Sequence, residues 1–180
     1  MNTTISKTNE KLPSVKQYIQ EIGILPQEAI LFGMCEDGLP YLLNVNDDIS
    51  PNVAIENGQA VLRTIHQYVT KTRISKKILV DCVYVTDFNE AQIIPALVDW
   101  SDKHPRNAKV IVLIDRLENL HYNNEFVWLL RNGAKHGIFI VASYNKQLEI
   151  LSEFQLNIRK DGEGFVAPEG LYNTVRFFAL

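Results

Sequence analysis

Two stretches of the sequence place polar side chains where an apolar segment ends, a common position for ligand-binding residues in α/β proteins. The run KVIVLID ends in Asp115, and a carboxylate at a strand end can hold the water shell of a Mg²⁺ ion. Asp is also favoured at strand ends because it caps the next turn, so both interpretations of Asp115 stay open. The stretch PNVAIENGQAVLRTI, from Pro51, joins a strand-like to a helix-like pattern, a junction that can bind phosphate.

The elements that would position these residues follow from hydrophobic periodicity. Residues 1–12 are polar and are predicted to be a flexible tail, and 13–180 a single domain. An amphipathic helix is expected after Pro13. The next two apolar runs are joined by Glu-Asp-Gly, which predicts an N-terminal β-hairpin.

From residue 51 onward, short apolar runs alternate with helical patterns, which predicts an α/β fold with a doubly wound, mostly parallel sheet flanked by helices. The expected strands are NVAI, KILVDCVYV, KVIVLID and GIFIVAS. Helices are expected over about 58–72, 89–103 and 123–135. The final runs FQLNIRK, GFVA and TVRFFAL are expected to be small C-terminal strands at the sheet edge.

The order of these segments resembles the FtsK/SpoIIIE type of the FtsK/HerA group of RecA-like ATPases. The segments that carry the resemblance, within about 28–180, are ILFGMCEDGLPYLLNVND, AVLRTI, KVIVLIDRLENL, WLLRNGAKHGIFIVAS and VRFFAL. Family members have a D-G-x-P turn before the Walker A strand, a Walker B strand followed by x-L-E-x-L, and a strand ending in a polar sensor. The resemblance implies a RecA-like domain with a P-loop site at the Pro51 stretch.

The residues at the Walker A position depart from that pattern. The motif G-x-x-x-x-G-K-[ST] needs glycines around the β-phosphate, a lysine for the β and γ oxygens and a hydroxyl for Mg²⁺. With Gly58 on the second glycine, Gln59 replaces the lysine and Ala60 replaces the hydroxyl residue. The loop is also shortened to a corner at Asn57, and Glu56 adds negative charge where a triphosphate would lie. We therefore expect a degenerate Walker A motif.

The Walker B and sensor positions are only partly kept. Asp115 remains, but Arg116 stands where an acidic residue often positions the attacking water. Glu118 could substitute, although a solvated position at a loop or helix start is the favoured interpretation. Asn145 lies where an amide could contact a γ-phosphate, and the favoured alternative is a cap on the following helix.

A small basic cluster, RNGAKHG, lies between a predicted helix and a predicted strand. The resemblance places this region near a subunit edge, so Arg131 could contact a neighbour's nucleotide in trans. The better-supported alternative is a solvated helix C-terminus, which favours cations.

Composition limits the other classes of function. The net charge of −3 gives no basic surface typical of a nucleic-acid binder, so nucleic acid is not expected to bind the isolated chain. Cys35 and Cys82 are expected to be packed thiols in a reducing cytosol, with a Cys82 nucleophile less favoured. The four histidines occur singly, so no metal site is expected. With no signal core and no membrane span, we expect a cytoplasmic protein.

These observations lead to one favoured function and two alternatives. The favoured one is a catalytically inactive P-loop-ATPase-like module that acts as a structural or partner-binding subunit, without a cofactor. Its expected partners are proteins, either a related active ATPase or a second copy of the chain. The alternatives are an unconventional ATP-binding or weakly hydrolysing NTPase, using ATP and Mg²⁺, and a nucleic-acid-contacting subunit of a translocase-like assembly.

Overall fold

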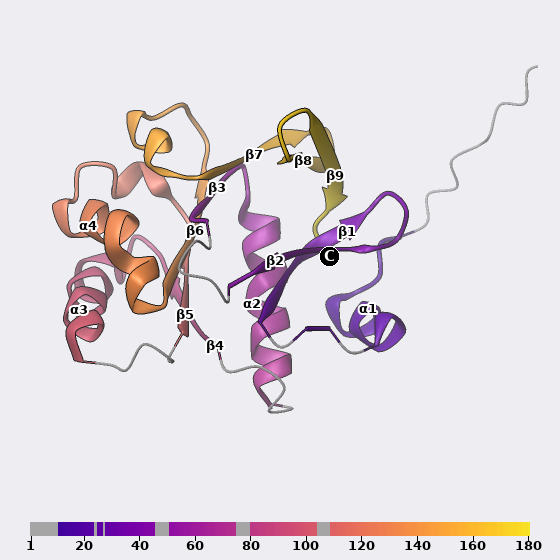
Figure 1. Cartoon of the computed structure of the whole chain (residues 1–180), viewed down its shortest axis with the longest axis horizontal. Coiled ribbons are helices and arrows are strands. Elements are labelled where there is room, and N and C mark those ends of the chain that lie inside the picture. Colours follow the sequence, from indigo (N-terminus) through magenta and orange to yellow (C-terminus); the bar gives the residue numbers. More distant parts are fainter. Residues whose placement is uncertain (1–10, 24, 27, 46–50, 75–79, 104–108) are drawn as a thin grey trace, which may run out of the picture.

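The computed structural model describes residues 11–23, 25–26, 28–45, 51–74, 80–103 and 109–180 (Figure 1). Most of the expected tail therefore lies outside the described residues. The helices are α1 Val15–Ile22, α2 Gln59–Ile74, α3 Glu90–Lys103 and α4 Asn124–Asn132, with 3-10 segments η1 Leu117–Asn119, η2 Gly133–His136 and η3 Glu149–Glu153. The strands are β1 Ala29–Cys35, β2 Pro40–Asn44, β3 Val53–Glu56, β4 Val80–Val85, β5 Lys109–Ile114, β6 Ile138–Tyr144, β7 Leu156–Asp161, β8 Gly164–Glu169 and β9 Asn173–Phe178.

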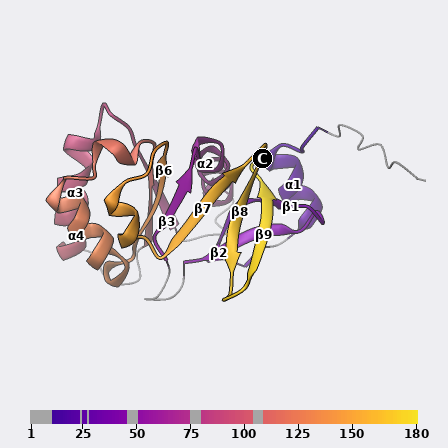
Figure 2. The same cartoon turned by 90° about the horizontal axis from the view of Figure 1, so that it is seen from above.

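The nine strands of the described residues form one curled sheet in the order β2-β1-β9-β8-β7-β3-β6-β5-β4 (Figure 2). The five strands β7, β3, β6, β5 and β4 run parallel to one another, and the other pairs are antiparallel. The mixed α/β fold and the parallel strands that were predicted from the alternating apolar runs are confirmed.

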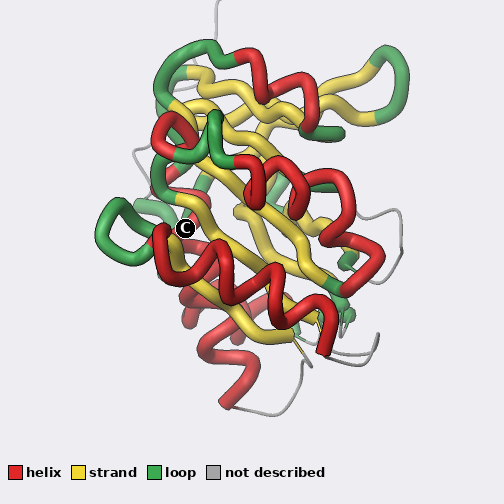
Figure 3. Tube along the Cα trace, turned by 90° about the vertical axis from the view of Figure 1, so that its left-hand side faces the viewer, coloured by secondary structure: helices red, strands yellow, loops and turns green. Residues whose placement is uncertain are grey.

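Two apolar cores lie on opposite faces of the parallel strands, because successive residues of a strand point to opposite sides. On one face Ile55 and Val141 pack with residues of α2, such as Leu62. On the other face Ala54 and Ile140 belong to a cluster with residues of α3, α4 and η3. In Figure 3 α3 and α4 lie in front of the strands, and α2 lies behind them. Coverage on both faces explains why these strands are nearly continuous apolar runs.

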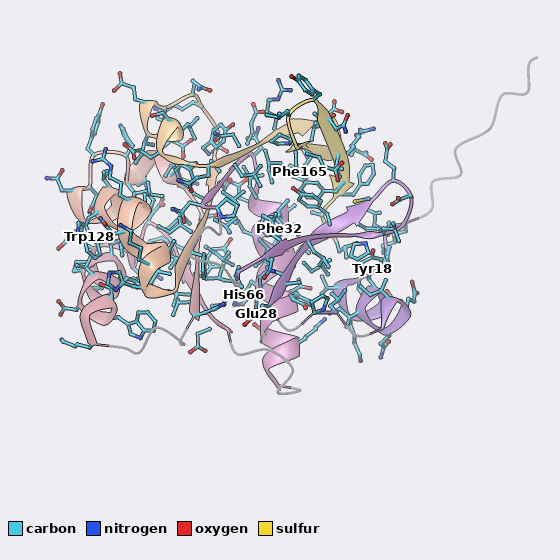
Figure 4. All side chains as sticks on the ribbon, in the orientation of Figure 1. Tyr18, Glu28, Phe32, His66, Trp128 and Phe165 are labelled. Atoms are coloured by element: carbon cyan, nitrogen blue, oxygen red, sulfur yellow. The ribbon has the colours of Figure 1, made fainter. Side chains whose placement is uncertain are left out.

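The predicted N-terminal hairpin and helix are confirmed. β1 and β2 pair antiparallel, and the Asp-Gly turn between them places Gly38 at φ 84°, a conformation that favours glycine. Helix α1 begins with a capping box between Ser14 and Gln17. The buried Tyr18 (labelled in Figure 4) donates a hydrogen bond of 2.8 Å to the Gly38 carbonyl oxygen, which fixes α1 against the hairpin.

The prediction that the C-terminal strands lie at the sheet edge is wrong. β7 pairs in parallel with β3, and β8 and β9 connect it to β1, so the edges of the sheet are β2 and β4. The short runs are not peripheral because their aromatic residues form core: Phe165 and Phe177 are buried and stack with ring centroids 5.5 Å apart. Strand pairing between distant segments leaves no trace in local periodicity, which is why the sequence could not show it.

Two predicted elements differ in extent. The helix expected over about 123–135 ends at Asn132 and continues as the 3-10 segment η2. β4 is described from Val80, so the first three residues of KILVDCVYV lie outside the described residues. Within the described part of the chain, no helix is long and apolar enough to cross a membrane.

The buried Asn52 joins four elements at the start of β3. Its side-chain amide donates to the Leu130 carbonyl oxygen of α4 at 2.8 Å, and its Oδ1 accepts from the Ile140 N–H of β6 at 3.0 Å. Its carbonyl oxygen accepts from the N–H of Leu156 in β7 at 3.2 Å. A single amide side chain therefore satisfies two buried main-chain groups, each of which would be costly to leave unpaired.

We expect Asn52→Leu to lower the free energy of unfolding by about 2 kcal/mol or more, because it leaves a buried carbonyl and a buried N–H unpaired at similar side-chain volume. Urea denaturation followed by circular dichroism measures the change. The matched control is Asn132→Ala, which removes an exposed amide bonded to the Trp128 carbonyl oxygen and should change stability by about 0.5 kcal/mol at most. Equal losses in both variants would contradict the role assigned to Asn52.

Candidate nucleotide-site remnant

The residues that the sequence singled out meet at the carboxyl edge of the parallel strands. Glu56 of β3 pairs with Tyr144 of β6, and Ile114 of β5 pairs with Ala142 of β6. The corner after β3, the residue Asp115 after β5 and the loop after β6 are therefore neighbours. This is the edge where open α/β sheets bind ligands, as the sequence predicted.

The corner between β3 and α2 consists of only Asn57 and Gly58. Asn57 takes a left-handed conformation with φ 48°, and its N–H donates to the Tyr144 carbonyl oxygen at 2.7 Å. The Gly58 N–H donates to the buried Ser143 hydroxyl at 2.9 Å. Two main-chain donors that a phosphate-binding loop would offer to its ligand are thus bonded to β6.

Gly58 is required by close packing. A Cβ on Gly58 would lie 2.6 Å from the Cβ of Ile55, a buried residue of β3. The glycine aligned with the Walker A motif therefore has a structural role here that does not involve a phosphate. Ser143, which fixes this corner, was missed by sequence reasoning, and its place as the last small residue of GIFIVAS is the signal that could have suggested it.

The side chain of Gln59 spans the site. Its amide Nε2 lies 3.5 Å from the main-chain oxygen of Asp115, a long hydrogen bond between the start of α2 and the end of β5. Gln59 and Ala60 are both half-buried. A neutral amide therefore crosses the space in which a Walker A lysine would meet phosphate oxygens.

Asp115 has a phenol as its neighbour. The half-buried carboxyl group of Asp115 is hydrogen-bonded to the hydroxyl of Tyr84 on β4. Burial raises the pKa of Tyr84 most, and the negative charge of Asp115 raises it further. His66 of α2, labelled in Figure 4, meets the Tyr84 ring edge-on at 5.8 Å. Sequence reasoning missed Tyr84, because nothing in KILVDCVYV shows which of its side chains lies on the same face of the sheet as the Asp115 carboxyl.

Arg116 forms an ion pair with Asp87, which precedes α3. The Arg116 Nη1 lies 3.3 Å from Asp87 Oδ2, and Asn119 donates to the other oxygen of Asp87 at 2.6 Å. An arginine at the position of the water-orienting acid thus forms an ion pair within its own chain, in an exposed position where such pairs contribute little stability.

Glu118, after β5, accepts hydrogen bonds from the loop that follows β6, which contains Asn145. Glu118 lies in η1, near the helix start that one interpretation predicted, and it is half-buried: its Oε1 accepts from the N–H groups of Asn145 and Lys146. Its Oε2 is buried without a hydrogen-bond partner among the described residues. The expected cap role of Asn145 is wrong, because the N-cap position of η3 is Leu148.

Arg131 lies in the last turn of α4, where the helix dipole favours cations. It forms a two-pronged ion pair with Glu153 of η3, in which Arg131 Nε donates to Oε2 at 3.0 Å and Nη2 bonds to Oε1. Hydrogen bonding to Arg131 lowers the pKa of Glu153. A contact of Arg131 with a neighbour's nucleotide stays a prediction and would require this pair to open.

Metal ligands are not grouped in the part of the chain that the structure describes, where no three His, Cys, Asp or Glu side chains come together. Cys82 is half-buried on β4, and burial, followed by the nearby charge of Asp81, raises the pKa of its thiol to about 12. The packed-thiol interpretation of Cys82 is confirmed in this respect.

The fold is similar to that of the ATPase domains of EccC and EssC, as solved structures show. The cytoplasmic domain of EssC matches 94% of this chain and 47% of its own, with a TM-score of 0.65 and 11% identity. ATPases 2 and 3 of Thermomonospora curvata EccC, in complex with a signal sequence peptide, match 93% of this chain and 42% of theirs, with a TM-score of 0.62 and 11% identity.

The cytoplasmic domain of the T. curvata type VII secretion ATPase EccC matches 87% of this chain and 29% of its own, with a TM-score of 0.58 and 12% identity. The chain spans less than half the length of these structures. No family model and no curated protein sequence matches it. At this level of identity the similarity establishes the fold and not the activity.

We expect Cys82 to react slowly with iodoacetamide in the folded protein, because the thiolate is the reactive form and its pKa rises from 9.0 to about 12. In a Cys35→Ser background at pH 8, alkylation should be about 1,000-fold slower than in urea, because three pKa units lower the thiolate fraction by about that factor, and it should accelerate as the pH rises towards 10. Mass spectrometry over time measures both rates. Native labelling as fast as in urea would contradict burial of Cys82.

Proposed function

We propose that this chain is a catalytically inactive P-loop-ATPase-like module that serves as a structural or partner-binding subunit. The observation that carries the proposal is the corner at Asn57 and Gly58, whose main-chain N–H groups donate to Tyr144 and Ser143. A phosphate-binding loop depends on such N–H groups being free to surround the β-phosphate. Here they stabilise the junction between a strand and a helix.

The remaining residues of the remnant support the same proposal. Asn57, Gly58, Gln59 and Ala60 form the former Walker A corner, and Asp115, Arg116 and Asn145 the former Walker B and sensor positions. Phosphoryl transfer requires positive charge and donors aimed at the developing anion. Gln59 offers no positive charge, Ala60 no metal-binding hydroxyl, and Arg116 is engaged with Asp87. Several contributions of a few kcal/mol each are absent from one site.

The partner-binding half of the proposal rests on the fold. Five parallel strands in the order β7-β3-β6-β5-β4, with helices on both faces, support a RecA-like doubly wound arrangement. Packing and phosphate binding use different residues, so a module can lose its chemistry and keep its surfaces. The EccC structure that holds a signal sequence peptide is a similar domain with a protein ligand. We propose that the chain acts in the cytoplasm and binds another protein. The expected partner is a related active ATPase or a second copy of the chain.

The experiment that tests inactivity is a titration of the purified chain with a fluorescent ATP analogue and Mg²⁺. We expect no saturable binding up to millimolar nucleotide, because the corner offers neither a free cradle nor a lysine. Asp115→Ala is the control. Micromolar binding that disappears with Asp115→Ala would overturn the proposal and favour an unconventional ATP site at the N-terminus of α2.

A second prediction concerns the shortened corner. The double variant Gln59→Lys, Ala60→Thr restores the side chains of a Walker A motif without lengthening the loop. We expect no measurable gain in ATP hydrolysis, because the Asn57 and Gly58 N–H groups would still donate to β6. The measurement is the rate of phosphate release from ATP by the double variant, compared with the rate for the unmodified chain. A clear gain in turnover would mean that the side chains alone, and not the corner, limit activity.

A further inference from the structure

The strand β4 offers an edge on which another strand can pair. Among the described residues no strand lies on its outer side, and all its residues pair with β5 in an unbroken register. Edge strands are often protected by proline or by a β-bulge. The other edge, β2, begins with Pro40, and its pairing with β1 shifts register between Leu31 and Gly33. β4 contains neither proline nor glycine, so it is the less protected edge.

The main-chain groups of alternate β4 residues point away from β5. The Val85 carbonyl oxygen accepts from the first residue after β5 at 3.0 Å, so Val85 bonds towards β5. Because alternate residues of a strand bond to opposite sides, the groups of Val80, Cys82 and Tyr84 point outward. The Tyr84 oxygen accepts from the Asn89 side chain at 3.0 Å. The other outward groups have no strand partner in the described part of the chain.

An apolar groove of about 510 Å³ lies beside this edge, between β4 and α3 (both labelled in Figure 1). Val83 lines it from β4 and Val110 from β5. Ile93 and Trp100, both half-buried, line it from α3. Ala96, which is exposed, lies midway along the α3 residues of the groove. A strand added to β4 would therefore cover apolar surface and also gain main-chain hydrogen bonds.

The β4 sequence disfavours two of the ways in which a second copy could pair with it in antiparallel fashion. A pair centred on Asp81 would place two carboxylates directly opposite each other, which is destabilising. A pair centred on Val83 would need the Tyr84 oxygen for half of its central hydrogen bonds, and that oxygen already accepts from Asn89.

A pair centred on Cys82 avoids both difficulties. Cys82 of each copy would exchange two hydrogen bonds with Cys82 of the other, and each Tyr84 N–H would donate to the Val80 oxygen of the other copy. Each Asp81 would lie opposite a Val83, so no like charges meet. This register uses the open outward groups and leaves the Asn89 bond in place.

The same two-fold arrangement brings the two α3 helices side by side in opposite directions. Glu90 lies in the first turn of α3 and Lys103 in the last, so the acidic end of each helix would meet the basic end of the other. The contact of Lys103 with Asp99 at 3.8 Å is an exposed pair, which contributes little and can exchange. Ala96 lines the groove together with Cys82 and would lie near the two-fold axis, where a small side chain lets the helices approach.

We propose that β4 and α3 form the interface between two copies of this chain, with the β4 strands paired antiparallel about Cys82. The two sheets then become one continuous sheet, and the two α3 helices pack on the same face of it. The proposal names a second copy as the partner, so it rests on the partner-binding half of the proposed function and not on inactivity.

The test is the oligomeric state of the full chain, measured by analytical ultracentrifugation from micromolar to millimolar concentration. We expect a reversible monomer–dimer equilibrium. Ala96→Glu should raise the dimer dissociation constant about 10-fold or more, because it places two carboxylates beside the two-fold axis. The matched control is Ala91→Glu, which changes an exposed alanine about 140° around the same helix from Ala96 and should leave the constant unchanged.

A second pair of variants tests the main-chain hydrogen bonds. Cys82→Pro removes the outward N–H and keeps the bonds between β4 and β5, as proline at an edge strand does, so dimerisation should be lost. Cys82→Val keeps the N–H and should still dimerise. Circular dichroism checks that both variants fold, and the alanine variants decide alone if Cys82→Pro does not fold.

The register is measured by isotope-filtered NMR on a dimer of one labelled and one unlabelled copy. Opposed residues that exchange no hydrogen bonds bring their Hα atoms close together in an antiparallel pair. We therefore expect a nuclear Overhauser effect between the Asp81 Hα of one copy and the Val83 Hα of the other. The same contact between two Val83 residues, or between two Asp81 residues, would contradict the register.

The proposal is overturned if the chain is a monomer at millimolar concentration, if both glutamate variants dimerise equally well, or if the contacts between copies come from β2. A monomer whose β4 amides shift on adding an extended peptide would assign the edge to another protein and would also overturn it. ATP hydrolysis separates the two proposals. A dimer that hydrolyses ATP supports the interface and contradicts inactivity, whereas an inactive monomer overturns the interface and supports inactivity.

Discussion

The position of β3 determines the rest of this structure. This strand of four residues lies between β6 and β7, with both neighbours parallel to it, so its main chain is hydrogen-bonded on both sides. Asn52 fixes the beginning of the strand to α4, β6 and β7, and the Asn57–Gly58 corner fixes its end to β6. A central strand fixed at both ends sets where α2 begins, and with it the spacing between α2 and the end of β5.

In the function that we propose, this constraint is the reason that the carboxyl edge does not act as an open phosphate site. A longer loop after β3 would have to break the bond from Gly58 to the buried hydroxyl of Ser143, and an unpaired buried donor costs about 1–3 kcal/mol. A side chain at Gly58 would collide with Ile55. The geometry that stabilises the strand–helix junction is therefore the same geometry that withdraws the donors a phosphate would need.

Much of the fold was predictable from local pattern. Alternating apolar runs gave the parallel strands and their helices, and the Asp-Gly turn gave the hairpin, because these signals lie within a few residues of one another. The central place of β7, β8 and β9 was not predictable, since it depends on which distant strands pair. The same limit applies to the site: Gln59 and Ala60 could be compared with a motif, but Tyr84 and Ser143 act through neighbours that only the strand register brings together.

The departures from the ATPase pattern are not isolated losses, because each substituted or retained residue is bonded within the chain. Gln59 reaches the main chain at Asp115, the Asp115 carboxyl meets Tyr84, and Arg116 meets Asp87. Glu118 joins the loop after β5 to the loop after β6. In an active enzyme this edge of the sheet must admit nucleotide and rearrange during turnover. In this chain, hydrogen bonds and ion pairs connect the neighbouring segments of the edge. Such an edge is pre-organised, and a pre-organised surface loses little entropy when it binds a partner. This is the physical reason that a module without catalysis, as we propose for this chain, can serve as a subunit.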